Sequence, residues 1–150
     1  MEIEEGSEYF FTVEKIINLA GTEYFVLLAE FDKKYLIPSI NYIEYKIKTG
    51  DKIKCKVDKI NCNGKVFLEP DCPIYSVGDN DVFTLQEKEE RITHKTYNEC
   101  MVIKAVSNKT NRGIVLITEK LQQCLQGEKW LCEIQKIKKG EMYLKPISKV

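Results

Sequence analysis

The sequence predicts an all-β protein that consists of two small domains in tandem. Three observations support this prediction: one segment is duplicated, apolar and β-branched residues gather in short runs, and glycine-containing turns separate those runs. A chain of 150 residues is long enough for one ordinary domain or two small ones. Charged residues make up 31% and hydrophobic residues 43%, which is typical of a soluble globular protein.

The duplicated segment comprises residues 50–60, which match residues 127–137 at a constant offset of 77. After a one-residue gap, residues 64–70 match residues 140–146. A glycine followed by an acid, a cysteine, a Lys-Ile pair, a turn glycine, an aromatic-Leu pair and a proline recur in the same order. Two copies are too few for a solenoid, so we expect two packed domains, residues 1–77 and 78–150.

The first copy is predicted to contain five strands. They are expected at residues 9–17, 22–31, 35–37, 52–60 and 65–68. The Asn63-Gly64 pair indicates a hairpin between the last two strands, because both residues tolerate a positive φ. Ile40, Ile43 and Ile47 follow helical spacing, so a helical turn or short helix is expected within residues 39–48.

The second copy follows the same order of elements. Strands are expected at residues 82–87, 100–107, 113–118, 129–137 and 142–144, with a helix at residues 119–124. The polar run over residues 87–98 is longer than its counterpart, and either extends the first strand or forms a projecting loop.

Five strands with a short helix between the third and the fourth is the element order of an OB-fold barrel. The first copy resembles an S1-type RNA-binding domain of this class in its segments YLIPS (35–39), GDKIKCKV (50–57) and GKVFLEP (64–70). The Leu-Glu-Pro ending and the CPIY segment (72–75) depart from the common form and resemble an S1-like subgroup of bacterial proteins. The match covers roughly residues 8–75. The second copy is divergent, and it is assigned to the same class because it aligns with the first copy as a repeat. The resemblance implies two tandem five-stranded OB-fold barrels that bind single-stranded nucleic acid.

The charge of the chain is balanced, with 23 Lys and Arg against 23 Asp and Glu. Residues 1–78 carry 10 basic and 13 acidic residues, and residues 79–150 carry 13 and 10. This balance argues against a strongly basic nucleic-acid binder but allows a local basic surface. No apolar run approaches the roughly 18 residues that cross a membrane, and the acidic start lacks the features of a signal peptide, so a cytoplasmic protein is expected.

The cysteines do not indicate a metal site. Six cysteines are present without any CxxC spacing, and the sequence has one histidine. A zinc site needs about four converging Cys and His ligands, so neither a metal nor another cofactor is expected. Cys55 and Cys132 lie at apolar positions of expected strands, which predicts buried free thiols.

Lys52, Lys54 and Lys56 alternate with apolar residues and are expected on the outer face of a strand. There they either form a solvated face or contact phosphates. Their counterparts in the second copy are Lys129, Leu131 and Glu133, so most of the lysine row is lost.

OB-folds usually bind ligands at their second and third strands, where aromatic residues beside cations favour single-strand binding. The alternative is that the aromatic residues fill the barrel cores. Alternation puts Tyr24 and Phe25 on opposite faces of the expected second strand, so one of the two is expected outside. The residues considered for nucleic-acid binding are Tyr24 or Phe25, Lys33, Lys34, Tyr35, Lys54 and Lys56 in the first copy, and Lys95, Tyr97, Lys104, Lys109 and Arg112 in the second. Trp130 replaces Ile53 at an inward position and is expected to fill the core.

No motif for catalysis or nucleotide binding occurs, and no enzymatic activity is expected. The resemblance to the S1 type implies binding of single-stranded nucleic acid, with RNA favoured and DNA left open. The alternative is a protein-interaction module that docks a partner through a barrel face or through the acidic edge formed by Glu2, Glu4 and Glu5.

Overall fold

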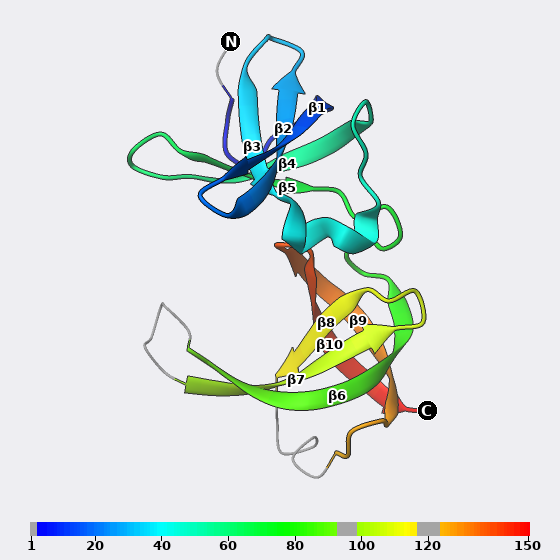
Figure 1. Ribbon diagram of the computed structural model, residues 1–150. Helices are drawn as coiled ribbons and strands as arrows, with labels where there is room; N and C mark the ends of the chain where they lie inside the picture. The colour runs from blue at the N-terminus through cyan, green and yellow to red at the C-terminus, as the bar shows by residue number, and fades with distance from the viewer. Residues whose placement is uncertain (1–2, 93–98, 117–123) are drawn as a thin grey trace. The chain divides into compact units, whose positions relative to one another are not determined.

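A computed structural model describes residues 3–92, 99–116 and 124–150 of the chain. The chain divides into two compact units, Met1–Ile74 (unit 1) and Tyr75–Val150 (unit 2). Both units are mostly β, and each contains a five-stranded sheet (Figure 1). The described residues contain no helix that is long and apolar enough to cross a membrane.

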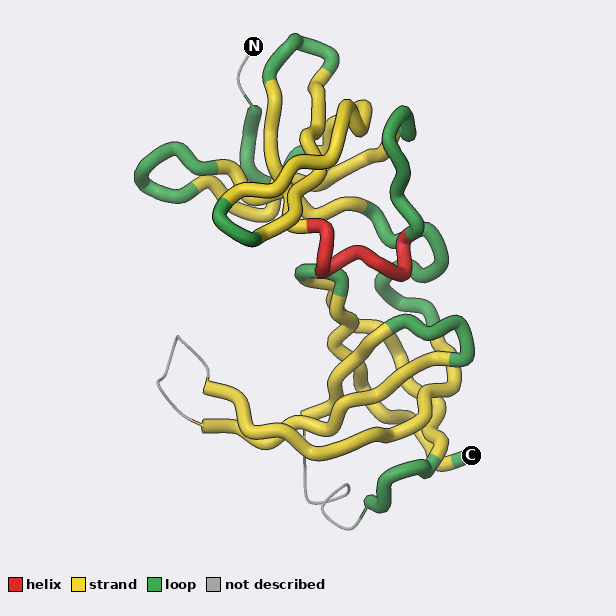
Figure 2. The backbone as a smooth tube through the Cα atoms, viewed as in Figure 1, coloured by secondary structure: helices red, strands yellow, loops and turns green. Residues whose placement is uncertain are grey.

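Unit 1 follows the predicted element order. Its elements are β1 (Glu8–Leu19), β2 (Thr22–Ala29), β3 (Lys34–Pro38), the 3-10 helix η1 (Ser39–Tyr45), β4 (Lys52–Ile60) and β5 (Val66–Pro70). Figure 2 shows η1 as the helix between β3 and β4, where the isoleucine spacing predicts it. The helix ends at Lys46, whose left-handed backbone (φ 55°) stops the helical turn.

The hairpin between β4 and β5 forms at the predicted Asn-Gly pair. Gly64 has a φ of +80°, which a glycine adopts without a steric penalty. The Asn61 side chain accepts hydrogen bonds from the N–H groups of Asn63 (3.1 Å) and Lys65 (2.8 Å). These bonds fix the turn locally, as is typical of asparagine in turns.

Unit 2 contains the corresponding strands. They are β6 (Asn80–Ile92), β7 (Glu99–Ser107), β8 (Arg112–Leu116), β9 (Lys129–Lys138) and β10 (Glu141–Lys149). Because β6 continues to Ile92, the polar run after residue 87 extends the strand, and residues 93–98 lie outside the described residues. The expected helix at 119–124 also lies outside them, except for Cys124, which is in an irregular segment.

The two units repeat the same backbone contacts, which supports the duplication seen in the sequence. The Gly50 N–H donates to the Val13 carbonyl at 2.7 Å, and the Gly127 N–H donates to the Leu85 carbonyl at 2.8 Å. Gly50 and Gly127 have φ values of +95° and +94°. A side chain at either position would be strained, so both copies retain glycine where β4 or β9 begins.

The cores also correspond. Phe11 and Phe83 are buried on the first strand of each unit, and Cys55 and Cys132 are fully buried on the fourth. The prediction of buried free thiols at these two positions is confirmed. Trp130 is buried beside Phe83 in the strand register, which confirms that it fills the core.

The two sheets differ in how their edges meet. In unit 2, β8 pairs with β10 in parallel, so the strand pairings form a ring in the order β10-β8-β7-β6-β9. In unit 1 the order is β3-β2-β1-β4-β5, and no strand pairing joins β3 to β5 within its described residues.

A glycine lies where β8 pairs with β10 in unit 2. A Cβ atom on Gly113 would lie 2.6 Å from the Leu144 side chain and 3.2 Å from the Met142 carbonyl oxygen. The strand registers show that the residue of unit 1 that corresponds to Gly113 is Tyr35. A side chain at this position of unit 2 would crowd Leu144, whereas unit 1 has Tyr35 at the corresponding place.

Candidate nucleic-acid interface

The lysine row lies on the outer face of β4, as its alternation predicts. Cys55 and Val57 are fully buried in the core of unit 1, whereas Lys52 and Lys56 are exposed and Lys54 is half-buried. The neighbouring strands carry further outward side chains. We call the outward side chains of β1, β4 and β5, together with Lys65 just before β5, the lysine face. Its residues are Glu8, Phe10, Thr12, Lys52, Lys54, Lys56, Lys59, Lys65, Phe67 and Glu69.

Carboxylates neutralise one end of this face. Lys52 pairs with Glu30 at 3.2 Å, and Lys54 pairs with Glu8 at 3.2 Å and with Asp71 at 3.5 Å. The hydrogen bond and charge of Glu8, followed by the charge of Asp71, raise the pKa of Lys54 above its ordinary value. Water and salt screen such exposed pairs, so they hold the lysines in place only weakly.

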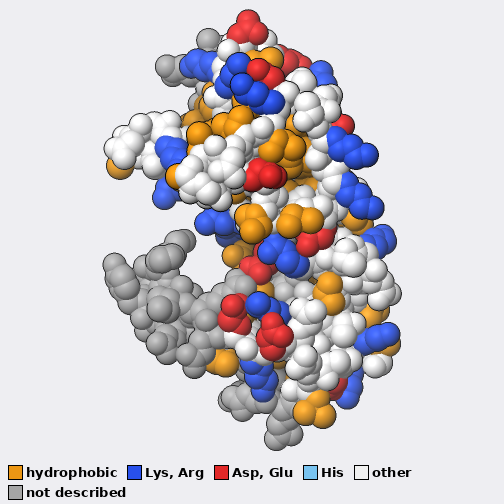
Figure 3. All heavy atoms as spheres, in the orientation of Figure 1, with side chains coloured by type: hydrophobic (Ala, Val, Ile, Leu, Met, Phe, Trp, Pro, Cys, Tyr) orange, Lys and Arg blue, Asp and Glu red, His pale blue; other side chains and the backbone are white. Residues whose placement is uncertain are grey.

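The other end of the face carries three further lysines. Lys56, Lys59 and Lys65 are exposed, and among the described residues none of them forms an ion pair. The Glu5 carboxylate near this end accepts a hydrogen bond from the Ile60 N–H at 2.7 Å. The space-filling view also shows lysine, acidic and hydrophobic side chains interspersed over unit 1 (Figure 3).

Two exposed phenylalanine rings flank the row, and each has a lysine ammonium over it. Phe10 is 49% exposed with Lys52 Nζ 5.3 Å from its ring centre, and Phe67 is 39% exposed with Lys65 Nζ at 5.0 Å. Neither ring was among the predicted binding residues. The alternation of Tyr9, Phe10 and Phe11 along the first strand is the signal that placed Phe10 opposite the core residues.

The platform predicted on the second and third strands does not assemble as expected. Of the alternatives Tyr24 and Phe25, Tyr24 faces outward, and Phe25 lies in the core at 6% exposure. Tyr35 lies on the core side of β3 with its ring 5.8 Å from Phe11, because strand alternation turns it away from Tyr24. Partial burial, with a smaller effect of Tyr9, raises the pKa of Tyr35.

The two lysines expected beside this platform are exposed at the start of β3. Lys34 pairs with Glu14 at 2.9 Å, and Lys33 lies in the preceding turn. The outer side of β2 and β3 therefore presents one aromatic residue, Tyr24, and a lysine that is already neutralised.

The candidate residues of unit 2 are dispersed. Lys104 on β7 lies 3.6 Å from Glu87 and 3.9 Å from Glu89. Lys109 is exposed in the β7–β8 turn with Nζ 5.4 Å from the ring centre of Tyr75, and Arg112 is half-buried at the start of β8. Lys95 and Tyr97 lie outside the described residues.

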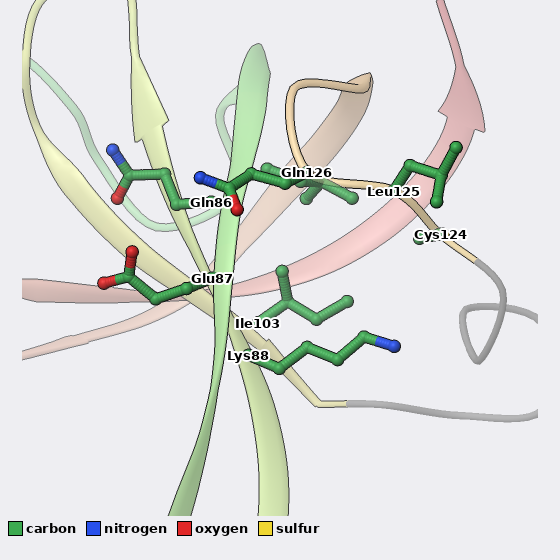
Figure 4. A pocket seen from close by; sticks show the side chains of 8 residues that line it. Gln86, Glu87, Lys88, Ile103, Cys124, Leu125 and Gln126 are labelled. Carbon is green, nitrogen blue, oxygen red and sulfur yellow. The ribbon is translucent and has the colours of Figure 1, made fainter.

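The pocket in Figure 4 lies in unit 2 and has a volume of about 260 Å³. It is lined by Leu85, Gln86, Glu87, Lys88, Ile103, Cys124, Leu125 and Gln126. Burial and the neighbouring Glu128 raise the pKa of the Cys124 thiol, so the thiol stays protonated and is a poor nucleophile. Within the described ranges, no group of three His, Cys, Asp or Glu side chains is arranged to hold a metal ion.

A scan of protein-family models found no match to this chain, and a search of curated proteins found none.

Proposed function

We propose that this chain binds single-stranded nucleic acid, RNA rather than DNA, through the lysine face of unit 1. The observation that carries this proposal is the half-exposed Phe10 ring with the Lys52 ammonium above it, next to Lys54 and Lys56. Single-strand binding combines aromatic rings, on which bases stack, with cations that follow the phosphates. The proposed activity is binding without catalysis.

The proposed architecture is a pair of OB-fold barrels of the S1-like type. Supporting it are the strand order of both units, η1 between β3 and β4, and the parallel pairing of β8 with β10 in unit 2. A five-stranded, partly open Greek-key barrel is the general form of the OB-fold. Because its β3 and β5 edges are unpaired, unit 1 is proposed to be the more open of the two barrels.

Binding is expected to be weak and strongly dependent on salt. Three or four lysines in contact with phosphates give a slope of about −2 to −3 for log K against log salt concentration, at about −0.7 per phosphate for single strands. Lys52 and Lys54 already form ion pairs with carboxylates, so a phosphate that binds either lysine must displace its carboxylate partner. The balanced net charge adds no long-range attraction.

Fluorescence anisotropy with 12-nucleotide RNA and DNA oligomers tests the proposal. We expect saturable binding of RNA at micromolar protein and low salt, and weaker binding of the Lys54→Glu/Lys56→Glu variant. Lys33→Glu/Lys34→Glu is the matched control on the β2–β3 side, and it should leave most of the binding intact. Absence of binding at low salt would refute the proposed function.

A second candidate function is docking of a partner protein on η1. Ile40 and Ile43 are 69% and 68% exposed and line a groove of about 340 Å³. Exposed apolar residues that line one groove favour contact with another protein. The acidic edge that the sequence offered for docking is partly engaged, since Glu5 is bound to the Ile60 N–H, and Glu2 lies outside the described residues.

Affinity purification of the wild type and of Ile40→Lys/Ile43→Lys, from the cells that make the protein, tests this candidate. A partner that is retained by the wild type and lost from the variant supports docking on η1. Equal recovery of every partner by both proteins contradicts it.

A further inference from the structure

The lysine face has two ends with different chemistry. At the Phe10 end, Lys52 and Lys54 are paired with carboxylates. At the Phe67 end, the exposed Lys56, Lys59 and Lys65 have no ion pair among the described residues. A phosphate that approaches the Phe67 end meets three lysine ammonium groups that no ion pair holds among the described residues.

The strand register gives the separation of the two rings. Phe10 lies opposite Lys54 on β4, and Phe67 lies opposite Lys59, with a bulge between Val57 and Lys59. The path crosses two strand spacings of about 4.8 Å and runs along β4 for about four residues at about 3.4 Å each, so the rings are roughly 17 Å apart. At the spacing of about 3.4 Å per nucleotide that a strand has in double-stranded DNA, this distance corresponds to about five nucleotide steps.

Acids also lie along this path. Glu8 on β1 and Glu69 on β5 both lie opposite Lys56, Asp58 occupies the bulge, and the Glu5 carboxylate accepts the hydrogen bond of the Ile60 N–H. In unit 2 the residue in the place of Lys56 is Glu133, so the corresponding path is interrupted by an acid. The two copies therefore differ in charge at the centre of the path.

We infer that a single strand of about five nucleotides crosses the lysine face diagonally from Phe10 to Phe67, with bases stacked on both rings and phosphates on Lys56, Lys59 and Lys65. This inference rests on the proposed function and places its site on β1, β4 and β5 rather than on β2 and β3. In the free protein each ammonium covers the ring face where a base stacks. At Phe67, binding moves the Lys65 ammonium from the ring to the adjacent phosphate.

Anisotropy with fluorescein-labelled oligouridylates of 3, 5, 8 and 12 nucleotides tests the path. Affinity should rise steeply to about five nucleotides and then only slowly, near the lower end of OB-fold site sizes. Phe67→Ala should weaken binding of the five-nucleotide probe by about 5- to 150-fold, as expected for one stacked base. Tyr143→Ala is the matched control, since Lys136 lies 5.5 Å from the Tyr143 ring centre in unit 2.

A second variant does not depend on the packing of Phe67. Lys59→Ala/Lys65→Ala removes two exposed cations and should reduce the magnitude of the salt slope by about 1.4, at about 0.7 per phosphate. If the wild type binds oligouridylates but neither variant changes the affinity or the slope, the diagonal path is wrong and the proposed function stands. If the wild type binds no oligomer, both fail.

Discussion

Gly113→Ala tests the steric account of close packing between β8 and β10 in unit 2. The new Cβ would lie 2.6 Å from Leu144 Cδ1, 3.1 Å from Leu144 Cγ and 3.2 Å from the Met142 carbonyl oxygen. Gly113 does not have a positive φ, so alanine causes no backbone strain at this position. The expected penalty therefore comes from crowding between β8 and β10.

The size of the effect follows from two opposing contributions. Overpacking of a well-packed site costs about 1–3 kcal/mol. Replacing glycine by alanine lowers the entropy of the unfolded chain, which stabilises the folded state by about 0.4–1 kcal/mol. We expect a net loss of about 1–2 kcal/mol for unit 2, which corresponds to a fall in Tm of roughly 4–16 °C for a domain of this size.

Trp130 provides the assay. It is the one tryptophan in the sequence and is buried in unit 2, so its fluorescence during urea unfolding reports on that unit. The Leu144→Ala variant lacks both crowding side-chain atoms. In that background, Gly113→Ala should lower the free energy of unfolding by at least about 1 kcal/mol less than in the wild type. This difference is the coupling free energy between the two residues in contact. A Gly113→Ala variant as stable as the wild type, with the same effect in both backgrounds, would refute the steric account.

Three further predictions concern buried polar and thiol groups. Burial raises the pKa of the Cys132 thiol to about 11, so above about pH 8.5 the unfolded state loses this proton first. The free energy of unfolding should therefore fall between pH 8.5 and 11, and urea titrations should show a shallower fall for Cys132→Ala; equal pH dependence contradicts this. Ellman's reagent should label the exposed Cys62 in the native protein and Cys55 only after unfolding, and rapid native labelling of Cys55 contradicts its burial. Tyr42→Phe removes a hydrogen bond of 3.2 Å to Glu69 and should cost about 1 kcal/mol in thermal unfolding, whereas an unchanged Tm argues against that bond.

Much of the fold was predictable because local patterns determine it. Period-2 alternation placed Cys55 and Val57 in the core and the lysines outside, and the repeat carried the strand order into the second copy. The difference in edge pairing was not predictable from these patterns. It involves the parallel pairing of β8 with β10, two strands that are distant in the sequence.

The candidate site was less predictable than the fold. Alternation alone left open which face of β2 is outside, so Tyr24 and Phe25 were equal alternatives until the core was known. Ion pairs such as Lys34 with Glu14 join residues 20 positions apart, and no local pattern reveals them. The exposed ring of Phe67 was missed because a run of apolar residues does not distinguish an inward from an outward aromatic side chain.

The most direct test of the central claim is a ¹H–¹⁵N NMR titration of the full chain with a five-nucleotide oligouridylate at low salt. Binding at the lysine face predicts saturable shifts of amide signals in β1, β4 and β5, centred on Phe10, Lys56 and Phe67, with the β7 and β8 signals unmoved. A spectrum that stays unchanged, or shifts confined to β2 and β3 or to unit 2, would contradict it.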